Sequence, residues 1–404
     1  MRILFSTALI VGRLFLARGA APAPNTGDVS CIVTASSGDD GPAFVDAVQR
    51  CDSVTIPRET TLSIATRMNM TGLKDKNINL LGTIKFTSNM SYWINNGFPF
   101  EFQDQIAFWI VGGKNILING GGTIDGSGQV WYDAFATNSA LLRPILLTIY
   151  KATDVAIKNI TMINSPEWFN FVNEGKNVVY DGINISALST SKNLAKNTDG
   201  WDIYRSDNVS IMNSNINNGD DCVSLKPNST NVIASDLYCN GSHGISVGSL
   251  GQYAGVYDIV ENFTSTNVHM YNAQNGARIK AFAGPGVGSG IVKNISYSFF
   301  TEGNVNNPLI VDQCYMTNAT ECTAYPSNVY IQDVTFSNFK GTSSGKMKSV
   351  VASLACSPDD RCNNISVNDI SLEPPSKDGS ATYSCQNVNI TGNAAYLFGN
   401  CKTT

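Results

Sequence analysis

The sequence is poor in charge and in histidine. Only 15% of its 404 residues are charged, the formal net charge is −5, and the chain has 2 histidines. No run of basic residues occurs, so the electrostatic footprint of a nucleic-acid-binding protein is missing and we expect no nucleic-acid partner. An anionic ligand would therefore need a local cluster of Arg or Lys.

Long hydrophobic runs are confined to the N-terminus. Met1-Arg2 precedes an apolar stretch that ends near Ala17, and the small residues Gly19-Ala20-Ala21 follow. This order is typical of a secretory signal peptide, which we place at residues 1–21. No later run is long enough to cross a bilayer. We therefore expect no membrane partner, a secreted, extracellular protein, and a mature chain of residues 22–404.

Clusters of Cys and His at zinc-ligand spacing are absent, and no glycine-rich segment has the context of a nucleotide loop. We expect no metal and no cofactor. The 10 cysteines instead indicate disulfides in an oxidising compartment. Spacing alone does not determine connectivity. Sequential pairing would give 31–51, 222–239, 314–322, 356–362 and 385–401. About a dozen Asn-x-Ser/Thr sites, Asn69 and Asn389 among them, fit a secreted glycoprotein.

Short strands with polar turns repeat along the chain. Segments of Asn or Asp followed by alternating apolar residues begin at positions 115, 154, 177, 208 and 231, and more loosely at 262, 294 and 328. The intervals between these starts fall within the period of about 20–50 residues that marks solenoids and other repeat proteins. Regular leucine spacing and propeller-blade signatures are missing. We therefore predict one all-β domain, a parallel β-helix with asparagines at its corners.

One helix is expected ahead of the strands. Residues 39–48 begin with two aspartates and an early proline, and Phe44, Ala47 and Val48 give an apolar face. A single helix before a stack of strands is typical of a cap over the open end of a solenoid. We therefore predict that this helix closes the N-terminal end.

Three polar segments recur with a constant spacing. Asp199, Asp221 and His243 are evenly spaced along the chain, and each of them precedes a short apolar alternation. If this interval is the length of one coil, the segments stack and their side chains converge. Repelling carboxylates such as Asp199, Asp220 and Asp221 favour one protonated and one ionised acid, as glycosidic bond cleavage requires. Calcium binding and ordinary turn aspartates remain the alternative interpretations.

Two basic residues follow on the next predicted coil. Arg278 and Lys280 would point to the same side of an alternating strand, which favours an anion clamp over a solvated pair. His243, between glycines 241 and 244, shares the spacing of the acids and could tune their pKa values. Together these residues indicate a carboxylated or sulfated substrate.

The four segments together resemble the signature motifs of the polygalacturonases, glycoside hydrolase family 28. The motifs are Asn197-Thr198-Asp199, Gly219-Asp220-Asp221, Ser242-His243-Gly244 and Arg278-Ile279-Lys280. The resemblance implies a right-handed parallel β-helix that hydrolyses α-1,4 bonds between galacturonic acids with inversion. In an inverting enzyme the acid and base stand roughly 6.5–9.5 Å apart.

The resemblance also implies roles for the site residues. Asp220 corresponds to the general acid, Asp199 and Asp221 correspond to the carboxylates that activate water, and His243 corresponds to the residue that supports the acid. The substrate-binding residues would be Asn197, Arg278, Lys280 and Tyr315.

Within the family, residues 244–253 and 200–204 are most similar to fungal exo-polygalacturonases. We therefore expect a monomeric enzyme that releases galacturonic acid from the non-reducing end of polygalacturonate. Exo action needs a blocked cleft, and a loop such as residues 93–105 could supply the wall. Endo-polygalacturonase, rhamnogalacturonan or xylogalacturonan hydrolase, a lyase on the same scaffold and a non-catalytic carbohydrate-binding β-helix remain alternatives.

Overall fold

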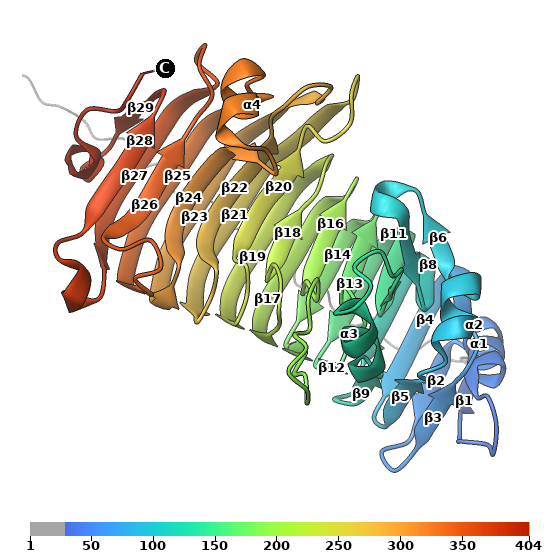
Figure 1. Cartoon of the computed structure of the whole chain (residues 1–404). Coiled ribbons are helices and arrows are strands. Elements are labelled where there is room, and N and C mark those ends of the chain that lie inside the picture. The colour runs from blue at the N-terminus through green and yellow to red at the C-terminus, as the bar shows by residue number, and fades with distance from the viewer. Residues whose placement is uncertain (1–28, 404) are drawn as a thin grey trace, which may run out of the picture.

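The computed structural model describes residues 29–403, so the predicted signal peptide at residues 1–21 lies outside the described part of the chain. Within it, 26 strands form one sheet in which every pairing is parallel and each strand hydrogen-bonds to its equivalents on the neighbouring coils. Figure 1 shows the strands stacked side by side along one axis from the N-terminal to the C-terminal end. The prediction of an all-β, right-handed parallel β-helix with an N-terminal capping helix is confirmed.

The strands form three faces of the coil. The face that carries the site, here called the site sheet, contains the first parts of β4 (Met68–Leu80), β8 (Trp109–Asn119) and β11 (Leu147–Lys158), followed by β13 (Asn170–Asn173), β16 (Trp201–Tyr204), β18 (Val223–Leu225), β20 (Ile245–Leu250), β22 (Asn275–Phe282), β24 (Asn307–Tyr315), β26 (Val350–Ala355) and β28 (Thr382–Gln386).

The other two faces are built by short strands at the N-terminal end and by long, bent strands farther along. The short ones are β1 (Ser30–Ile32), β2 (Ser53–Ile56), β3 (Thr61–Ile64), β5 (Thr83–Phe86), β9 (Thr123–Asp125), β12 (Thr161–Ile163), β14 (Lys176–Asp181) and β15 (Asn184–Ser186). The later ones are β17 (Asp207–Asn217), β19 (Ser229–Asn240), β21 (Tyr257–Tyr271), β23 (Ser289–Val305), β25 (Asn328–Ser343), β27 (Cys362–Glu373) and β29 (Val388–Thr391).

The corner asparagines form a hydrogen-bonded ladder. Asn208 donates to Asn177 at 2.8 Å, Asn262 to Asn231 at 3.0 Å, and Asn294 to Asn262 at 2.7 Å. All of these residues have φ between 55° and 59°, a left-handed conformation that Asn tolerates better than most residues. The predicted corner at Asn328 is wrong, because Lys293 pairs with Gln332 and Ile295 with Val334, which places Asp333 opposite Asn294.

The capping helix α1 spans Gly41–Arg50, with Pro42 in its first turn and with Phe44, Ala47 and Val48 buried, as predicted. Phe44 meets the indole of Trp109 edge-on at 5.9 Å, which packs the helix onto the open end of the core. All five disulfides follow the sequential pairing.

A small second sheet lies against the site sheet. It contains β6 (Phe98–Phe100), β7 (Gln105–Ala107) and β10 (Pro144–Ile145), and it follows the short helix α2 (Met90–Asn96). We call residues 97–107 the cover segment. The prediction that the wall begins at Trp93 is wrong, because Trp93 is fully buried in the main core against Phe86 and Phe108.

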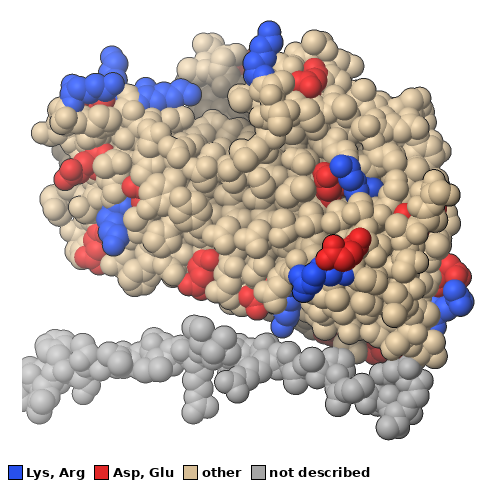
Figure 2. Space-filling view, turned by 90° about the horizontal axis from the view of Figure 1, so that it is seen from below, with Lys and Arg blue, Asp and Glu red and all other residues tan. Residues whose placement is uncertain are grey.

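Two further short helices, α3 (Gln129–Phe135) and α4 (Ala319–Ala324), and three 3₁₀ turns, Phe102–Asp104, Ser376–Asp378 and Ala395–Phe398, complete the described elements. Charged groups on the face shown in Figure 2 are scattered singly or in small mixed groups, with no continuous patch of one sign. None of the helices in residues 29–403 has the length and apolar character that a membrane span requires.

Candidate active site

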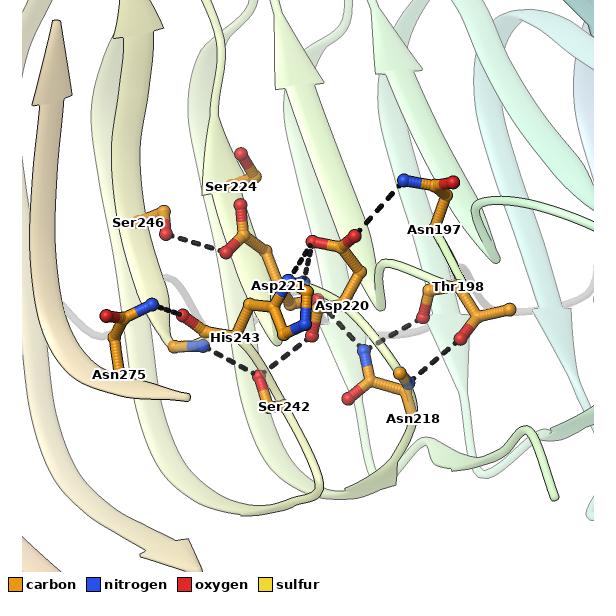
Figure 3. A network of polar contacts seen from close by, with 12 residues as sticks. Asn197, Thr198, Asn218, Asp220, Asp221, Ser224, Ser242, His243, Ser246 and Asn275 are labelled. Carbon is orange, nitrogen blue, oxygen red and sulfur yellow. Dashed lines mark hydrogen bonds and ion pairs between the residues drawn. The ribbon is translucent and has the colours of Figure 1, made fainter. Parts of the chain in front are cut away.

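The constant spacing between Asp199, Asp221 and His243 is the length of one coil. Asp202 pairs with Ser224 and Ser224 with Ser246 in the parallel register of β16, β18 and β20. The three evenly spaced residues each lie three positions before one of these aligned residues. The structure therefore brings them to the same corner of successive coils; Figure 3 shows Asp221 and His243 at this corner.

Backbone and side-chain hydrogen bonds hold this corner. The Asn218 amide donates to the carbonyls of Thr198 at 2.8 Å and Asp221 at 3.0 Å, and the Ser242 hydroxyl donates to the carbonyl of Asp220 at 3.0 Å (Figure 3). The Asn275 amide donates to the carbonyl of His243 at 2.7 Å. The acids are thus carried on a turn whose polar backbone groups are paired from one coil to the next.

Asp220 is the most exposed of the three clustered carboxylates. Its Oδ1 accepts from the backbone N–H of Asp221 at 2.8 Å and lies 3.0 Å from Nδ1 of His243. Its Oδ2 accepts from Nδ2 of Asn197 at 3.2 Å. Burial lowers the pKa of His243, but the hydrogen bond to Asp220 and the negative charge around it outweigh that effect and raise the pKa. The contact favours an imidazolium beside Asp220.

Asp221 is buried and paired. Its Oδ2 accepts from Nζ of Lys280 at 2.7 Å, and its Oδ1 accepts from the hydroxyl of Ser246 at 2.7 Å. Burial alone would raise the pKa of Asp221, but Lys280, Arg278 and Lys226 lower it below its usual range. Asp221 is therefore held ionised. Lys280, predicted to bind a substrate carboxylate, has its ammonium group on a carboxylate of the site.

Asp199 differs from Asp221 although it occupies the equivalent corner one coil earlier. It is also buried, and among the described residues its side chain has no hydrogen-bond partner. Burial raises the pKa of Asp199 well above its usual value, and the charges of Asp202 and Asp220 act in the same direction. Two stacked carboxyl groups thus hold opposite protonation preferences, which is the arrangement that acid–base chemistry uses.

The three carboxyl groups of the site lie close together. One oxygen from each of Asp199, Asp220 and Asp221 lies within 4.8 Å of the others. The separation of roughly 6.5–9.5 Å refers to the carboxyl groups of the acid and the base and stays a prediction, because 4.8 Å describes only one oxygen from each residue. This is also a set that could share a cation. However, the buried ammonium groups of Lys280 and Lys226 already supply positive charge to it.

Arg278 and Lys280 lie on the same side of β22, as predicted, and both approach Tyr315 on the following coil. Arg278 pairs with Ser246 in register, and its guanidinium carbon lies 5.1 Å from the centre of the Tyr315 ring, while Nζ of Lys280 lies 5.4 Å from it. Nε of the buried Arg278 side chain has no hydrogen-bond partner within the described residues. The guanidinium therefore retains unused hydrogen-bonding capacity next to the acids.

Sequence reasoning missed an ion pair beside the acids. Asp202 and Lys226 lie 2.9 Å apart, and both side chains are buried. Burial lowers the pKa of Lys226, but the carboxylates of Asp202, Asp199 and Asp221 outweigh it and raise the pKa. Asp202 lies three residues after Asp199 in the predicted strand, and Lys226 lies five after Asp221. The pair could have been predicted from the sequence, because both residues lie at outward positions in or directly after the strands that follow Asp199 and Asp221.

The floor of the site changes character at β16. The outward row of the site sheet runs in register through Ile110, Thr148, Phe171, Asp202, Ser224, Ser246 and Arg278. Ile110 and Phe171 lie in an apolar cluster with Phe102 and Ala107 of the cover segment. The row beyond them is polar and leads to the acids.

The cover segment reaches across several coils. The ring of Phe102 stacks on Tyr204 at 4.0 Å between centroids, and Phe100 meets Phe171 edge-on at 5.4 Å. Gln103 donates through Nε2 to Oε1 of Gln252 at 3.1 Å, a contact that joins residues 149 positions apart. The site sheet is therefore covered on the N-terminal side of Asp202.

Comparison with known proteins agrees with the motifs and the geometry. The family model "Glycosyl hydrolases family 28" matches residues 48–395. The chain belongs to this family of glycoside hydrolases. It is 43% identical over 390 residues to an exopolygalacturonase of Cochliobolus carbonum, with 93% of this chain and 87% of the relative covered.

Solved structures agree as well. The endo-xylogalacturonan hydrolase of Aspergillus tubingensis matches with a TM-score of 0.84 and 32% identity, over 93% of this chain and 99% of that one. A hyperthermoactive exopolygalacturonase of Thermotoga maritima matches with a TM-score of 0.71 and 17% identity, over 93% and 94% of the two chains. At that identity the second match speaks for the fold alone.

Proposed function

We propose that the protein is an exo-acting polygalacturonase that hydrolyses the α-1,4 bond at the non-reducing end of polygalacturonate and releases galacturonic acid. The observation that carries the exo assignment is the change along the outward row of the site sheet. This row is covered by Phe102 and its neighbours up to Phe171 and is polar from Asp202 onward. A substrate chain cannot run past the acids on the covered side. The exopolygalacturonase relative supports the same assignment.

In this proposal Asp220 is the general acid. It is more exposed than Asp199 and Asp221, and its two oxygens are held by Asn197, His243 and the backbone of Asp221. Both Asp199 and Asp221 would activate the attacking water: Asp221, kept ionised by Lys280, would accept its proton, and Asp199 would orient it. Such acid–base assistance contributes about 10²–10⁴-fold to rate.

Arg278 would bind the carboxylate of the sugar at the cleavage site. Its guanidinium lies beside the Tyr315 ring and has an unpartnered Nε among the described residues. Lys280 would share its charge between Asp221 and the substrate, and Asn197 would contact the sugar from the other side of Asp220.

Inversion at the anomeric carbon is a further part of the proposal, and it needs its own test because the carboxyl oxygens lie within 4.8 Å. Inverting hydrolysis of an α-linkage releases the β-anomer first. Proton NMR during the first minutes of hydrolysis should show the β-anomer of galacturonic acid before mutarotation. Early appearance of the α-anomer would mean retention through a covalent intermediate.

The exo assignment is tested by following reducing ends and viscosity together on polygalacturonic acid. We expect reducing ends to accumulate while viscosity falls slowly. Replacing residues 98–104 by a short Gly-Ser linker should make viscosity fall faster for the same number of reducing ends. Shortening the remote turn at residues 376–378 is the matched control. Rapid viscosity loss with mixed oligomers from the unaltered enzyme would overturn the exo assignment, and unsaturated products would indicate a lyase.

A second candidate is hydrolysis of xylogalacturonan, because the solved relative with 32% identity has that activity in its name. Parallel assays on polygalacturonate and xylose-substituted galacturonan separate the two. We expect faster release from the unsubstituted chain, and preference for the substituted one would favour the second candidate.

We also propose that residues 1–21 are removed as a signal peptide and that the mature enzyme acts outside the cell as a monomer. Five disulfides fit an oxidising compartment. N-terminal sequencing and size-exclusion chromatography of the secreted protein test these statements.

A further inference from the structure

We propose that Arg143 is a positioning residue for the catalytic acid and that it acts through Asn197. The inference rests on the proposed function of Asp220. Arg143 lies outside the repeated motifs, 54 residues before Asn197, and directly precedes β10. No spacing in the sequence points to it.

Arg143 is held rigidly. Its side chain is 1% exposed, and Nη1 donates to the carbonyls of Pro166 at 2.9 Å and Lys196 at 2.7 Å. Its guanidinium lies over the Phe135 ring of α3, 3.6 Å from the centroid, and 3.6 Å from Glu167. These contacts fix the plane of the guanidinium. Nη2 is the atom that lies 3.6 Å from Oε1 of Glu167, and among the described residues it makes a hydrogen bond to one partner.

That partner is Oδ1 of Asn197, which accepts from Nη2 at 2.8 Å. A guanidinium has only donors, so the amide atom that faces it must be the oxygen. The other amide atom, Nδ2, must then face Asp220, where it donates to Oδ2 at 3.2 Å. Arg143 thereby excludes the flipped amide, which would turn an acceptor toward the carboxylate of the acid.

The consequence for catalysis follows from the two oxygens of Asp220. Oδ1 is already occupied by the N–H of Asp221 and lies next to His243. Oδ2 is the oxygen left to carry the transferable proton, and its only hydrogen-bond donor among the described side chains is Asn197. The Asn197 amide therefore sets the direction in which the acid presents its proton.

Arg143 also joins the acid to the cover segment. The strand that follows it, β10, pairs with Ile106 and Ala107 of β7. The same residue thus lies between the cover segment and the group that is proposed to cleave the substrate. A misplacement of about 1 Å at a reacting group can cost about 100-fold in rate, so a remote residue of this kind can control kcat.

The test is a double-mutant cycle with Arg143→Met, Asn197→Ala and the double variant, assayed on polygalacturonate. We expect Arg143→Met to lower kcat by up to about 100-fold with KM changed by less than about twofold. We expect the double variant to be no slower than Asn197→Ala alone, because Arg143 acts through Asn197. Effects on kcat that multiply, or a loss of thermal stability with unchanged kcat, would overturn the proposal.

Two additions guard against a merely structural effect. Arg143→Lys keeps the charge but loses the planar fork, and we expect it to share the kcat defect even where Arg143→Met folds poorly. Arg361→Met, which removes contacts to Ser327 and Tyr330 far along the coil, should lower stability without lowering kcat.

A measurement that does not depend on activity separates this proposal from the proposed function. In a crystal structure of Arg143→Lys, we expect the Asn197 amide to leave Asp220 or to occupy two orientations. An Asn197–Asp220 contact that persists at 3.2 Å would overturn the positioning role, whatever the enzyme cleaves.

Discussion

Two rows of side chains, the corner asparagines and the site aspartates, are both built by stacking equivalent residues on successive coils. Neighbours attract each other in the first row and repel each other in the second. At one corner, asparagines such as Asn208, Asn231 and Asn262 repeat from coil to coil, and amide hydrogen bonds of 2.8 Å and 3.0 Å link members of this row. At the other corner, Asp199 and Asp221 occupy equivalent positions on neighbouring coils. Stacked amides satisfy one another, whereas stacked carboxylates repel and are tolerated only with Lys280, Lys226 and a retained proton.

In both rows the coil supplies proximity, and the chemistry of the side chain decides how that proximity is used. An amide offers both a donor and an acceptor, so identical neighbours stabilise the fold. A carboxylate offers acceptors alone, so identical neighbours repel each other. This repulsion moves their pKa values apart, so that one acid keeps a proton while its neighbour is ionised. Substitutions in the two rows should therefore differ in their effects on activity and stability.

The largest effect is expected for Asp220→Asn. The amide cannot donate a proton to the leaving oxygen, so we expect kcat to fall by about 10²–10⁴-fold or more. We expect little change in stability, because the removal of one charge from a repelling cluster offsets the weakened contacts with His243 and Asn197. Initial rates and thermal melting check both. Asp236→Asn, which alters an acceptor of a remote Asn267 contact, is the matched control and should keep its activity. A comparable loss of activity in both variants would contradict the distinction between the catalytic acids and the corner residues of the scaffold.

Lys280→Met should affect both activity and stability. It leaves the buried carboxylate of Asp221 without its 2.7 Å partner, and breaking a buried ion pair costs about 3–5 kcal/mol. Denaturant unfolding and initial rates measure the two effects. Lys74→Met removes an exposed lysine at the other end of the coil and should change neither. An unaltered free energy of unfolding for Lys280→Met would show that Asp221 does not need this charge.

Stability should depend on pH through the acids that retain a proton. Burial raises the pKa of Glu167 from 4.5 to about 7, and it raises the pKa of Asp199 well above its usual value. An acid whose pKa is higher in the folded protein than in the unfolded chain stabilises the fold fully at pH values below its unfolded-state pKa. This stabilisation is lost as the pH rises through its folded-state pKa. We expect Tm to fall between about pH 5 and pH 8. Glu167→Gln should flatten the decline, and a Tm that rises over this range would contradict it.

The smallest effect is expected in the amide ladder. Asn231→Ala removes the contacts with Asn262 and Asp207 and places alanine at a φ of 55°. Each lost hydrogen bond and the left-handed backbone strain cost about 1 kcal/mol apiece. We expect a small loss in the denaturant midpoint and unchanged kcat. Asn95→Ala, an exposed amide outside the ladder, is the control. A large activity loss for Asn231→Ala would mean that the ladder is not merely scaffold.

Sequence reasoning succeeded where one coil repeats the next. The spacing between Asp199, Asp221 and His243 predicted their register because strand pairing in the solenoid is local and periodic. It failed at Asn328, since β25 begins before its corner residue Asp333. Periodicity also could not find Arg143, because this residue comes from an insertion 54 positions from its partner Asn197.

The cover segment also could not be predicted in detail from a local sequence pattern. A loop near residues 93–105 was expected to close the groove. The aromatic contacts of Phe102 with Tyr204 and Phe171 depend on tertiary packing that no local pattern encodes. Trp93, the first residue of the expected wall, is instead fully buried in the core.

The cover over the site sheet is best examined with short oligogalacturonates labelled at the reducing end, with products separated at early times by mass spectrometry. A site sheet covered up to Phe171 predicts unlabelled galacturonic acid as the first product and labelled chains that shorten by one sugar at a time. Labelled fragments of several lengths appearing together from the start would contradict the blocking role of the cover segment and the exo action derived from it.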